Sequence, residues 1–225
     1  MSQYDLVLGS KPDAPLPDIA PRRIYTANGA ASLARHYRAR GTPRVISIVA
    51  TKQMQKPEVR DSIIAAAPDE IIGRKDYPLA AEVFADVLPD TKTSNLSMQA
   101  QFRLQQQVFG PWIYLALTHK HGLGHNVGRV IKFLLGRKPV LGVSTGAFAI
   151  VYALMQDQEI PVVVSGIGLE AGGHFYGQGK FKSTTGRKDY MILPHMPDKL
   201  KSRLYTTDTG FSRHVGVRTW GEAVL

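Results

Sequence analysis

The fold is decided by residues 139–166, which read PVLGVSTGAFAIVYALMQDQEIPVVVSG. A short apolar run leads into a turn of small and hydroxyl residues, and the apolar stretch 147–155 then predicts a helix. A second apolar run, residues 161–165, predicts another strand. This order of strand, helix and strand indicates a parallel βαβ unit. Because the first turn of a helix has free N–H groups, the turn at Ser144 and Thr145 also predicts an anion site.

The remaining apolar runs extend the same pattern along the chain. Further strands are predicted at residues 4–8, 23–25, 45–50 and 70–72, and helices at residues 30–40 and 77–87. Strands that alternate with helices at this spacing favour an α/β, Rossmann-like fold with a largely parallel sheet flanked by helices. Polar residues 88–111 predict a loop followed by a surface helix. With no linker or repeat visible, we expect one domain over residues 1–225, with a small lid around residues 170–195.

The composition narrows the class of protein. The 225 residues are 44% hydrophobic, which is enough for a proper core. The chain has no cysteine, which excludes disulfides and thiolate zinc sites and favours an intracellular, cytoplasmic location. A net charge of +10 predicts an anionic partner, and peripheral association with an anionic membrane surface is compatible with it. No nucleic-acid-binding motif is present, so we expect no nucleic acid partner.

Small polar residues follow four of the predicted strands. They are Gly9 and Ser10, then Asn28, then Ser144, Thr145 and Gly146, and finally Gly166. In doubly wound sheets, ligands bind beyond the carboxyl ends of the parallel strands. We therefore expect these residues to line one crevice of a size that suits a nucleotide.

The order of these motifs resembles the bacterial sialyltransferases of the Campylobacter type and, more distantly, the animal sialyltransferases. The similar segments are residues 6–16, 24–28, 143–154, 160–168, 173–176 and 194–200. The resemblance implies a sialyltransferase-like variant of the GT-A fold. It also implies an inverting, metal-independent enzyme without a cofactor, which moves a sugar from CMP-sialic acid or CMP-Kdo to a hydroxyl of a glycan or glycolipid.

The resemblance also assigns roles to individual residues. His195 would be the catalytic base and Tyr176 would donate a hydrogen bond to the departing phosphate, while His174 would contact substrate. Gly9, Ser10, Asn28, Ser144, Thr145, Gly146 and Gly166 would bind the donor. Imidazole suits proton removal near neutral pH. A monophosphate leaving group can be held by hydroxyls and amides, and the chain has no Asp-x-Asp pair for a metal. Lys11 and Asp13 depart from the family's Asn-Gly-Pro-Ser turn.

Two other functions fit parts of the sequence. Gly142, Ser144 and Gly146 match the G-x-S-x-G pattern of a serine hydrolase, in which Asp198 and His214 could complete a triad. The chain could also be a non-catalytic module that binds an anionic glycan. The spacing of His119, His121 and His125 could suit a metal, but Gly122 and Gly124 weaken any helix there. Residues 208–210 read DTG, which alone is insufficient for an aspartic protease.

Overall fold

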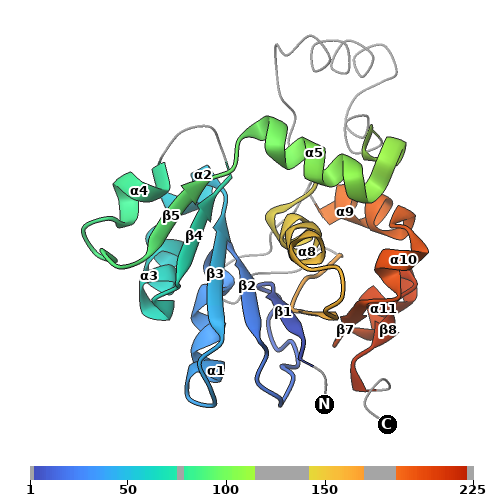
Figure 1. Ribbon diagram of the computed structural model, residues 1–225, viewed down its shortest axis with the longest axis horizontal. Helices are drawn as coiled ribbons and strands as arrows, with labels where there is room; N and C mark the ends of the chain where they lie inside the picture. The colour runs from blue at the N-terminus through green and yellow to red at the C-terminus, as the bar shows by residue number, and fades with distance from the viewer. Residues whose placement is uncertain (1–2, 75–78, 115–141, 170–185, 222–225) are drawn as a thin grey trace.

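The computed structural model describes residues 3–74, 79–114, 142–169 and 186–221 (Figure 1). Its strands form one eight-stranded sheet in the order β5-β4-β3-β2-β1-β6-β7-β8, and every neighbouring pair is parallel. The strands are β1 Asp5–Leu8, β2 Arg23–Ala27, β3 Arg44–Val49, β4 Glu70–Gly73, β5 Lys92–Asn95, β6 Val162–Ser165, β7 Leu204–Thr206 and β8 Arg218–Thr219. The chain therefore has the α/β, Rossmann-like fold that the sequence predicts.

Helices cover both faces of the sheet. They are η1 Asn28–Ala34, α1 Arg35–Arg38, α2 Thr51–Met54, α3 Pro57–Ala66, α4 Leu79–Phe84, α5 Met98–Phe109, η2 Gly110–Trp112, α8 Thr145–Gln156, α9 Gly186–Ile192, η3 Leu193–His195, α10 Asp198–Lys201 and α11 Thr209–Val215. Helices α5, α8, α9 and α11 pack against one face, whereas η1, α1 and α3 pack against the other. Figure 1 shows α8 near the middle of the molecule, seen almost end-on below α5, and α8 contacts both α5 and the central strands β1 and β2.

Alternate residues of each central strand enter different cores. Val7 of β1 and Tyr25 of β2 belong to the core under α8, whereas Leu6, Leu8 and Ile24 belong to the core under η1. All five are fully buried. A parallel sheet with both faces covered needs apolar residues at every position, which explains why these strands read as continuous apolar runs.

The strand order places a topological switch point between β1 and β6. From β1 the chain adds β2, β3, β4 and β5 in one direction, and it later returns through α8 to place β6 on the other side of β1. The segments that leave β3 and β5 lie at the top of Figure 1, so the carboxyl ends of the strands point that way. A crevice for a ligand is expected between the carboxyl ends of β1 and β6.

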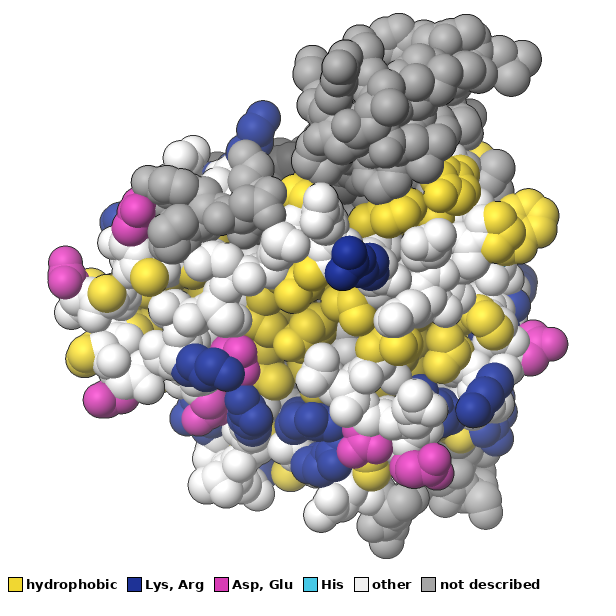
Figure 2. All heavy atoms as spheres, turned by 45° about the horizontal axis from the view of Figure 1, so that its top comes forward, with side chains coloured by type: hydrophobic (Ala, Val, Ile, Leu, Met, Phe, Trp, Pro, Cys, Tyr) yellow, Lys and Arg dark blue, Asp and Glu magenta, His cyan; other side chains and the backbone are white. Residues whose placement is uncertain are grey.

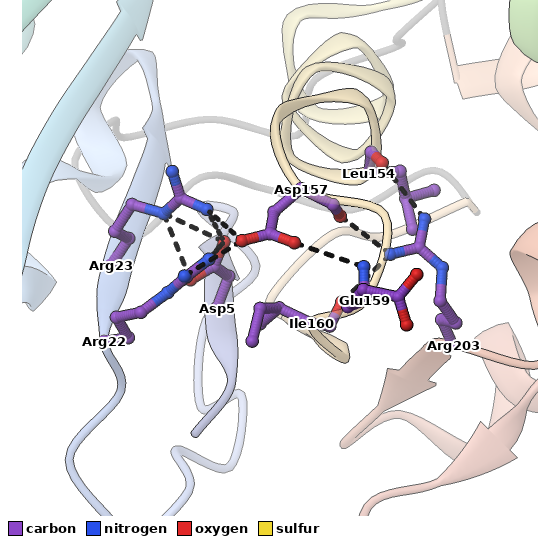
Figure 3. Close-up of polar contacts among 8 residues, drawn as sticks. All are labelled: Asp5, Arg22, Arg23, Leu154, Asp157, Glu159, Ile160 and Arg203. Carbon is purple, nitrogen blue, oxygen red and sulfur yellow. Dashed lines mark hydrogen bonds and ion pairs between the residues drawn. The ribbon is translucent and has the colours of Figure 1, made fainter. Parts of the chain in front are cut away.

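The carboxyl end of α8 is tied to the opposite end of the sheet by charged residues (Figure 3). Arg203 donates hydrogen bonds to the carbonyl oxygens of Leu154, Asp157 and Ile160, at 3.0, 2.8 and 3.1 Å. The Asp157 carboxylate lies 3.0 Å from a guanidinium nitrogen of Arg22. Figure 3 shows Arg22 and Arg23 converging from the start of β2 on Asp157 and on the buried Asp5 of β1. This end of α8 is therefore fixed by paired charges.

The sequence predicted the long apolar elements and missed the short or polar ones. The predicted strands at residues 4–8, 23–25, 45–50, 70–72 and 161–165 are all present, as β1, β2, β3, β4 and β6. The predicted helix over residues 30–40 is instead a 3-10 turn, η1, followed by one turn of α-helix, α1. The surface helix within residues 88–111 is α5, but the loop before it contains β5.

The proposed lid falls mostly on residues outside the described ranges. Of residues 170–195, the structure describes only α9 and η3, where Ile192 and Leu193 are fully buried in the core under α8. Within the described ranges, no helix has both the length and the apolar character needed to cross a membrane.

Candidate functional site

Gly9 and Gly166 bring the ends of β1 and β6 into direct backbone contact. The amide of Gly9 donates to the carbonyl of Ser165, and the amide of Lys11 donates to the carbonyl of Gly166, both at 2.8 Å. A Cβ atom added to Gly9 would lie 2.2 Å from the carbonyl oxygen of Gly166. Gly166 itself has a φ of 71°, a conformation that favours glycine. Both glycines are therefore required by the geometry of the switch point.

The amino end of α8 lies beside this contact. Ile167, directly after Gly166, packs 3.4 Å from the position of a Cβ atom on Gly146. Ser144 is the N-cap of α8: its hydroxyl accepts from the amide of Ala147 at 3.2 Å, and its carbonyl accepts from that of Phe148 at 2.9 Å. The structure thus brings together Gly9, Gly166 and the Ser144 turn, as the sequence predicted. The amides of Thr145 and Gly146 have no acceptor among the described residues.

The turn before α8 is held from behind by side chains of other elements. The amide of Val143 donates to Oε1 of Gln105 at 3.0 Å, and the amide of Ser144 donates to Oδ1 of Asp189 at 2.8 Å. A Cβ atom on Gly142 would lie 2.4 Å from that Gln105 oxygen, so the side chain packs closely against the backbone. The backbone of the turn is fixed before any ligand arrives, and this preorganisation lowers the cost of binding.

Arg74, directly after β4, lies buried beneath the amino end of α8. Its guanidinium donates to Oε1 of Gln101 at 3.0 Å, to the hydroxyl of Thr145 at 3.1 Å and to the carbonyl of Val143 at 3.3 Å. It also lies over the ring of Phe148, 4.4 Å from the centroid. The side chain is 3% exposed, and this burial lowers the pKa of Arg74 to about 9, so the group stays charged at neutral pH. Sequence reasoning missed it, although it follows a predicted strand end.

Asp189 of α9 is the carboxylate whose charge acts on Arg74, and it favours the charged form of the arginine. It is 2% exposed, and burial raises its pKa to about 6. The hydroxyl and amide of Ser144, and the positive charges of Arg74 and Lys188, oppose that rise. Among the described residues, none of the carboxylates comes within ion-pair distance of Arg74. A positive charge with neutral hydrogen-bond partners therefore lies below the α8 N-terminus, and it adds to the attraction of the helix end for an anion.

His195 is in the 3-10 turn that continues α9. Its imidazole stacks on the ring of Trp112, with centroids 4.1 Å apart and planes at 9°. The side chain is half-buried, and the neighbouring carbonyl of Pro194 accepts from Nζ of Lys201 at 2.7 Å. Stacking fixes the plane of the imidazole, and the side chain is only partly covered, so it is a candidate general base. Through α9 it is linked to Asp189 and the Ser144 turn.

Asn28 has a structural contact at the predicted nucleotide site. It has a φ of 53°, and its Oδ1 accepts from the amide of Ala50 at 3.0 Å, which joins the ends of β2 and β3. Only its Nδ2 could donate to a nucleotide. Ser10 is buried directly after β1.

Lys11 and Asp13 change the turn after β1 in different ways. Lys11 pairs with the carboxylate of Asp208, which is also the N-cap of α11 and accepts from the amide of Phe211 at 2.9 Å. Asp13 has a φ of 55°. The charge of Lys11 is therefore already compensated by Asp208, and the DTG tripeptide at residues 208–210 is simply the start of a helix.

The structure assigns other roles to the three residues of a hydrolase triad. Ser144 has φ −61° and ψ 171°, without the strain of a nucleophile elbow, and its hydroxyl is used by the cap of α8. Nε2 of His214 lies 2.7 Å from the carbonyl oxygen of Tyr190, and the two rings stack at 3.5 Å. Asp198 is exposed in the first turn of α10. No described contact joins these three side chains.

Several predicted residues lie outside the described ranges: Tyr176, His174, and the histidines His119, His121 and His125. In the part of the chain that the structure describes, no group of three or more His, Asp or Glu side chains could hold a metal ion. A surface hollow lined by Arg38, Arg44 and Asp69 lies at the amino ends of β3 and β4, away from the switch point.

Comparison with protein-family models, with curated proteins and with solved structures found no match. The site supplies backbone amides at a helix start, a buried cation beneath them and a stacked imidazole on the helical segment that carries Asp189. Such a set can hold an anionic group and remove a proton from a neighbouring hydroxyl.

Proposed function

We propose that the chain is an inverting, metal-independent glycosyltransferase that moves an acidic sugar from a CMP donor to a hydroxyl of a glycan or glycolipid. The observation that carries the proposal is the arrangement at the switch point. There the Gly9–Gly166 contact lies beside the amino end of α8, and Arg74 adds a buried positive charge beneath that end. The identity of the donor comes from the sialyltransferase resemblance of the sequence.

The donor phosphate is bound by the start of α8. The Ser144 hydroxyl and amide are already used within the protein, so the amides of Thr145 and Gly146 bind the phosphate oxygens. The Thr145 hydroxyl accepts from Arg74, which directs its own proton toward the ligand. As the bond to the sugar breaks, negative charge grows on the phosphate. Donors fixed in advance stabilise that charge without a divalent cation.

His195 removes the proton from the acceptor hydroxyl. Attack of the acceptor oxygen on the anomeric carbon and departure of CMP from the opposite face invert the configuration. The proton passes to the imidazole, whose ring plane is fixed by Trp112. Removal of a general base of this kind lowers turnover by roughly 10²- to 10⁴-fold.

The surface charge fits a substrate-sized anionic site better than a broad electrostatic interface. Figure 2 shows Lys and Arg side chains beside Asp and Glu along the lower part of the face, whereas the described surface above them is largely apolar or uncharged. Several basic residues are paired, as Arg22, Arg23 and Lys11 are. The net charge of +10 therefore does not form one uninterrupted patch on this face.

The experiment measures CMP release from CMP-sialic acid and from CMP-Kdo, together with CMP affinity by isothermal titration calorimetry. We expect one donor to be turned over, and we expect His195→Ala to abolish turnover while CMP affinity changes less than about threefold. His214→Ala, a second histidine stacked on an aromatic ring, is the matched control and should retain turnover. Binding of CMP without turnover of any donor would indicate the non-catalytic module. Labelling of Ser144 by a serine-directed phosphonate would indicate the hydrolase.

A further inference from the structure

We propose that Asp189 is a positioning residue that sets the separation between the phosphate-binding turn at Ser144 and the imidazole of His195. It acts on the turn through a hydrogen bond and on the imidazole through the helix that carries both residues. The effect on turnover rests on the proposed function. The effect on the position of His195 does not, and it can be measured separately.

The link from Asp189 to the turn is short and partly buried. Oδ1 of Asp189 accepts from the amide of Ser144 at 2.8 Å, and the side chain is 2% exposed. A hydrogen bond from a backbone amide to a buried carboxylate is strong, because the carboxylate has little access to water that could replace the amide. The position of α9 is therefore fixed relative to the start of α8.

The link from Asp189 to His195 is a continuous helical segment. Helix α9 ends at Ile192, whose φ of −96° and ψ of −41° lead directly into η3, Leu193–His195. Ile192 and Leu193 are fully buried, so this segment cannot rotate about its own axis without breaking core contacts. A displacement of Asp189 is therefore transmitted to the imidazole six residues later.

The far side of the imidazole is held by a different element. Trp112 of η2 stacks on it, and η2 continues α5, which also carries the Gln105 that binds the Val143 amide. The phosphate turn and the base are thus connected twice, once through Asp189 and once through α5. With Asp189 removed, the connection through α5 and the core packing of Ile192 and Leu193 remain, but the direct hydrogen bond between α9 and the turn is lost.

Burial raises the pKa of Asp189, whereas its charged form is favoured first by its hydrogen bonds with Ser144 and then by the positive charges of Arg74 and Lys188. A neutral amide could accept the Ser144 hydrogen bond equally well, and it would avoid the cost of burying a carboxylate. The groups that face Asp189 are Ser144 of α8, Arg74 after β4, and Lys188 of its own helix. The carboxylate offsets part of the positive charge of Arg74, which otherwise lies among neutral partners. Positioning therefore needs the acceptor oxygen, and the charge is secondary.

The test compares Asp189→Ala with Asp189→Asn, which keeps the acceptor oxygen. The control is Asp198→Asn, a carboxylate that is close to His195 in sequence but exposed. A Trp220→Phe background leaves Trp112 as the single tryptophan, since the chain has two. A protonated imidazole stacked on an indole quenches its fluorescence, so a pH titration of emission reports whether His195 still stacks on Trp112.

We expect Asp189→Ala to lose most of the pH-dependent quenching and to lower kcat by on the order of 10²-fold, as a displacement of about 1 Å does. Asp189→Asn should keep the quenching and lose less than about fivefold in kcat, and Asp198→Asn should match the unmodified protein. The proposal would be overturned if Asp189→Ala kept both the pH-dependent quenching and kcat of the unmodified protein. It would also be overturned if Asp189→Asn lost as much quenching and kcat as Asp189→Ala.

Two further results keep the test decisive. If neither CMP-sugar is turned over, the proposed function fails, but the quenching series still decides the role of Asp189. If Asp189→Ala does not fold, hydrogen exchange of the Ser144 amide in the unmodified protein decides. We expect strong protection there, and exchange at the rate of an exposed amide would contradict the link.

Discussion

The two ends of helix α8 use arginine in opposite ways. At the carboxyl end, Arg203 caps three carbonyl oxygens, and Asp157 beyond it is paired with Arg22 and Arg23 (Figure 3). At the amino end, Arg74 is buried among neutral acceptors and has no carboxylate at ion-pair distance among the described residues. The carboxyl end therefore has its charges paired at short distance, whereas at the amino end Asp189, which binds the Ser144 amide, offsets the Arg74 charge only in part.

This difference identifies the part of the net charge on which the proposed function depends. A chain with 28 basic residues suggests an anionic partner, but paired arginines on the surface contribute little attraction. A single cation in a low-dielectric position under a helix N-terminus acts much more strongly on an anion nearby. For attraction of an anion to this site, the position of a cation and whether it is paired thus matter more than the net charge of the chain.

Replacement of Gly9 should have the largest effect, because the new Cβ atom would lie 2.2 Å from the Gly166 carbonyl oxygen. We expect Gly9→Ala to lower the free energy of unfolding by about 3 kcal/mol or more and to abolish CMP binding. The measurements are urea denaturation and calorimetry. Gly41→Ala, at the other end of the sheet, is the control, since its Cβ atom would be 3.7 Å from its nearest neighbour, Ala20. Equal stability of the two variants would show that the β1–β6 contact is looser than described.

The two ends of α8 should respond to pH with opposite sign. Burial raises the pKa of Asp189 to about 6 from 3.8, so folding favours its protonated form, and the stability from this group is lost as pH rises through 6. Relative to Asp189→Asn, the unmodified protein should lose about 2 kcal/mol of unfolding free energy between pH 4 and pH 7. Urea denaturation across that range measures it.

The comparison variant for this prediction is Asp157→Asn at the carboxyl end. The Glu159 amide, followed by Arg22, lowers the pKa of Asp157. Its contribution is therefore present above its ordinary pKa and is lost as pH falls. Relative to Asp157→Asn, the unmodified protein should gain stability as pH rises. If the difference in unfolding free energy from the unmodified protein changed with pH in the same direction for both variants, the proposed electrostatic difference between the two ends would be contradicted.

Replacement of Arg203 should have a smaller effect, confined to stability. Arg203→Met keeps the aliphatic part of the side chain but removes three hydrogen bonds to carbonyl oxygens, at a cost of about 2 kcal/mol in unfolding free energy. CMP affinity should not change. The exposed Arg213 provides the control, and Arg213→Met should stay within about 0.5 kcal/mol of the unmodified protein. A loss of CMP affinity in Arg203→Met would mean that the carboxyl end also shapes the site.

The sequence predicts those parts of the fold and site that depend on local pattern. The apolar runs of β1 and β6 and the glycines that end them are visible without a structure, because a buried parallel strand and a close backbone contact leave direct traces in composition. The cap at Ser144 is equally local, since its partner Ala147 is three residues away.

The missed features depend on contacts between distant residues or on polar edges. Arg74 reaches Thr145 across 71 positions, and Asp189 reaches Ser144 across 45, so no window of sequence contains both partners. The edge strand β5 has no fully buried position, and β8 has only two residues, so neither needs the apolar run that marks a central strand. The bond from the Ala50 amide to Asn28 is also between distant residues and was not predicted, while the role of Asn28 in binding the donor stays a prediction.

A crystal structure of the protein with CMP would test the central claim most directly. We predict that the phosphate lies within hydrogen-bond distance of the Thr145 and Gly146 amides, between the ends of β1 and β6, with His195 facing the side from which the acceptor approaches. CMP bound with its phosphate elsewhere, for instance in the hollow beside Arg38 and Arg44, and an empty α8 N-terminus would contradict the account.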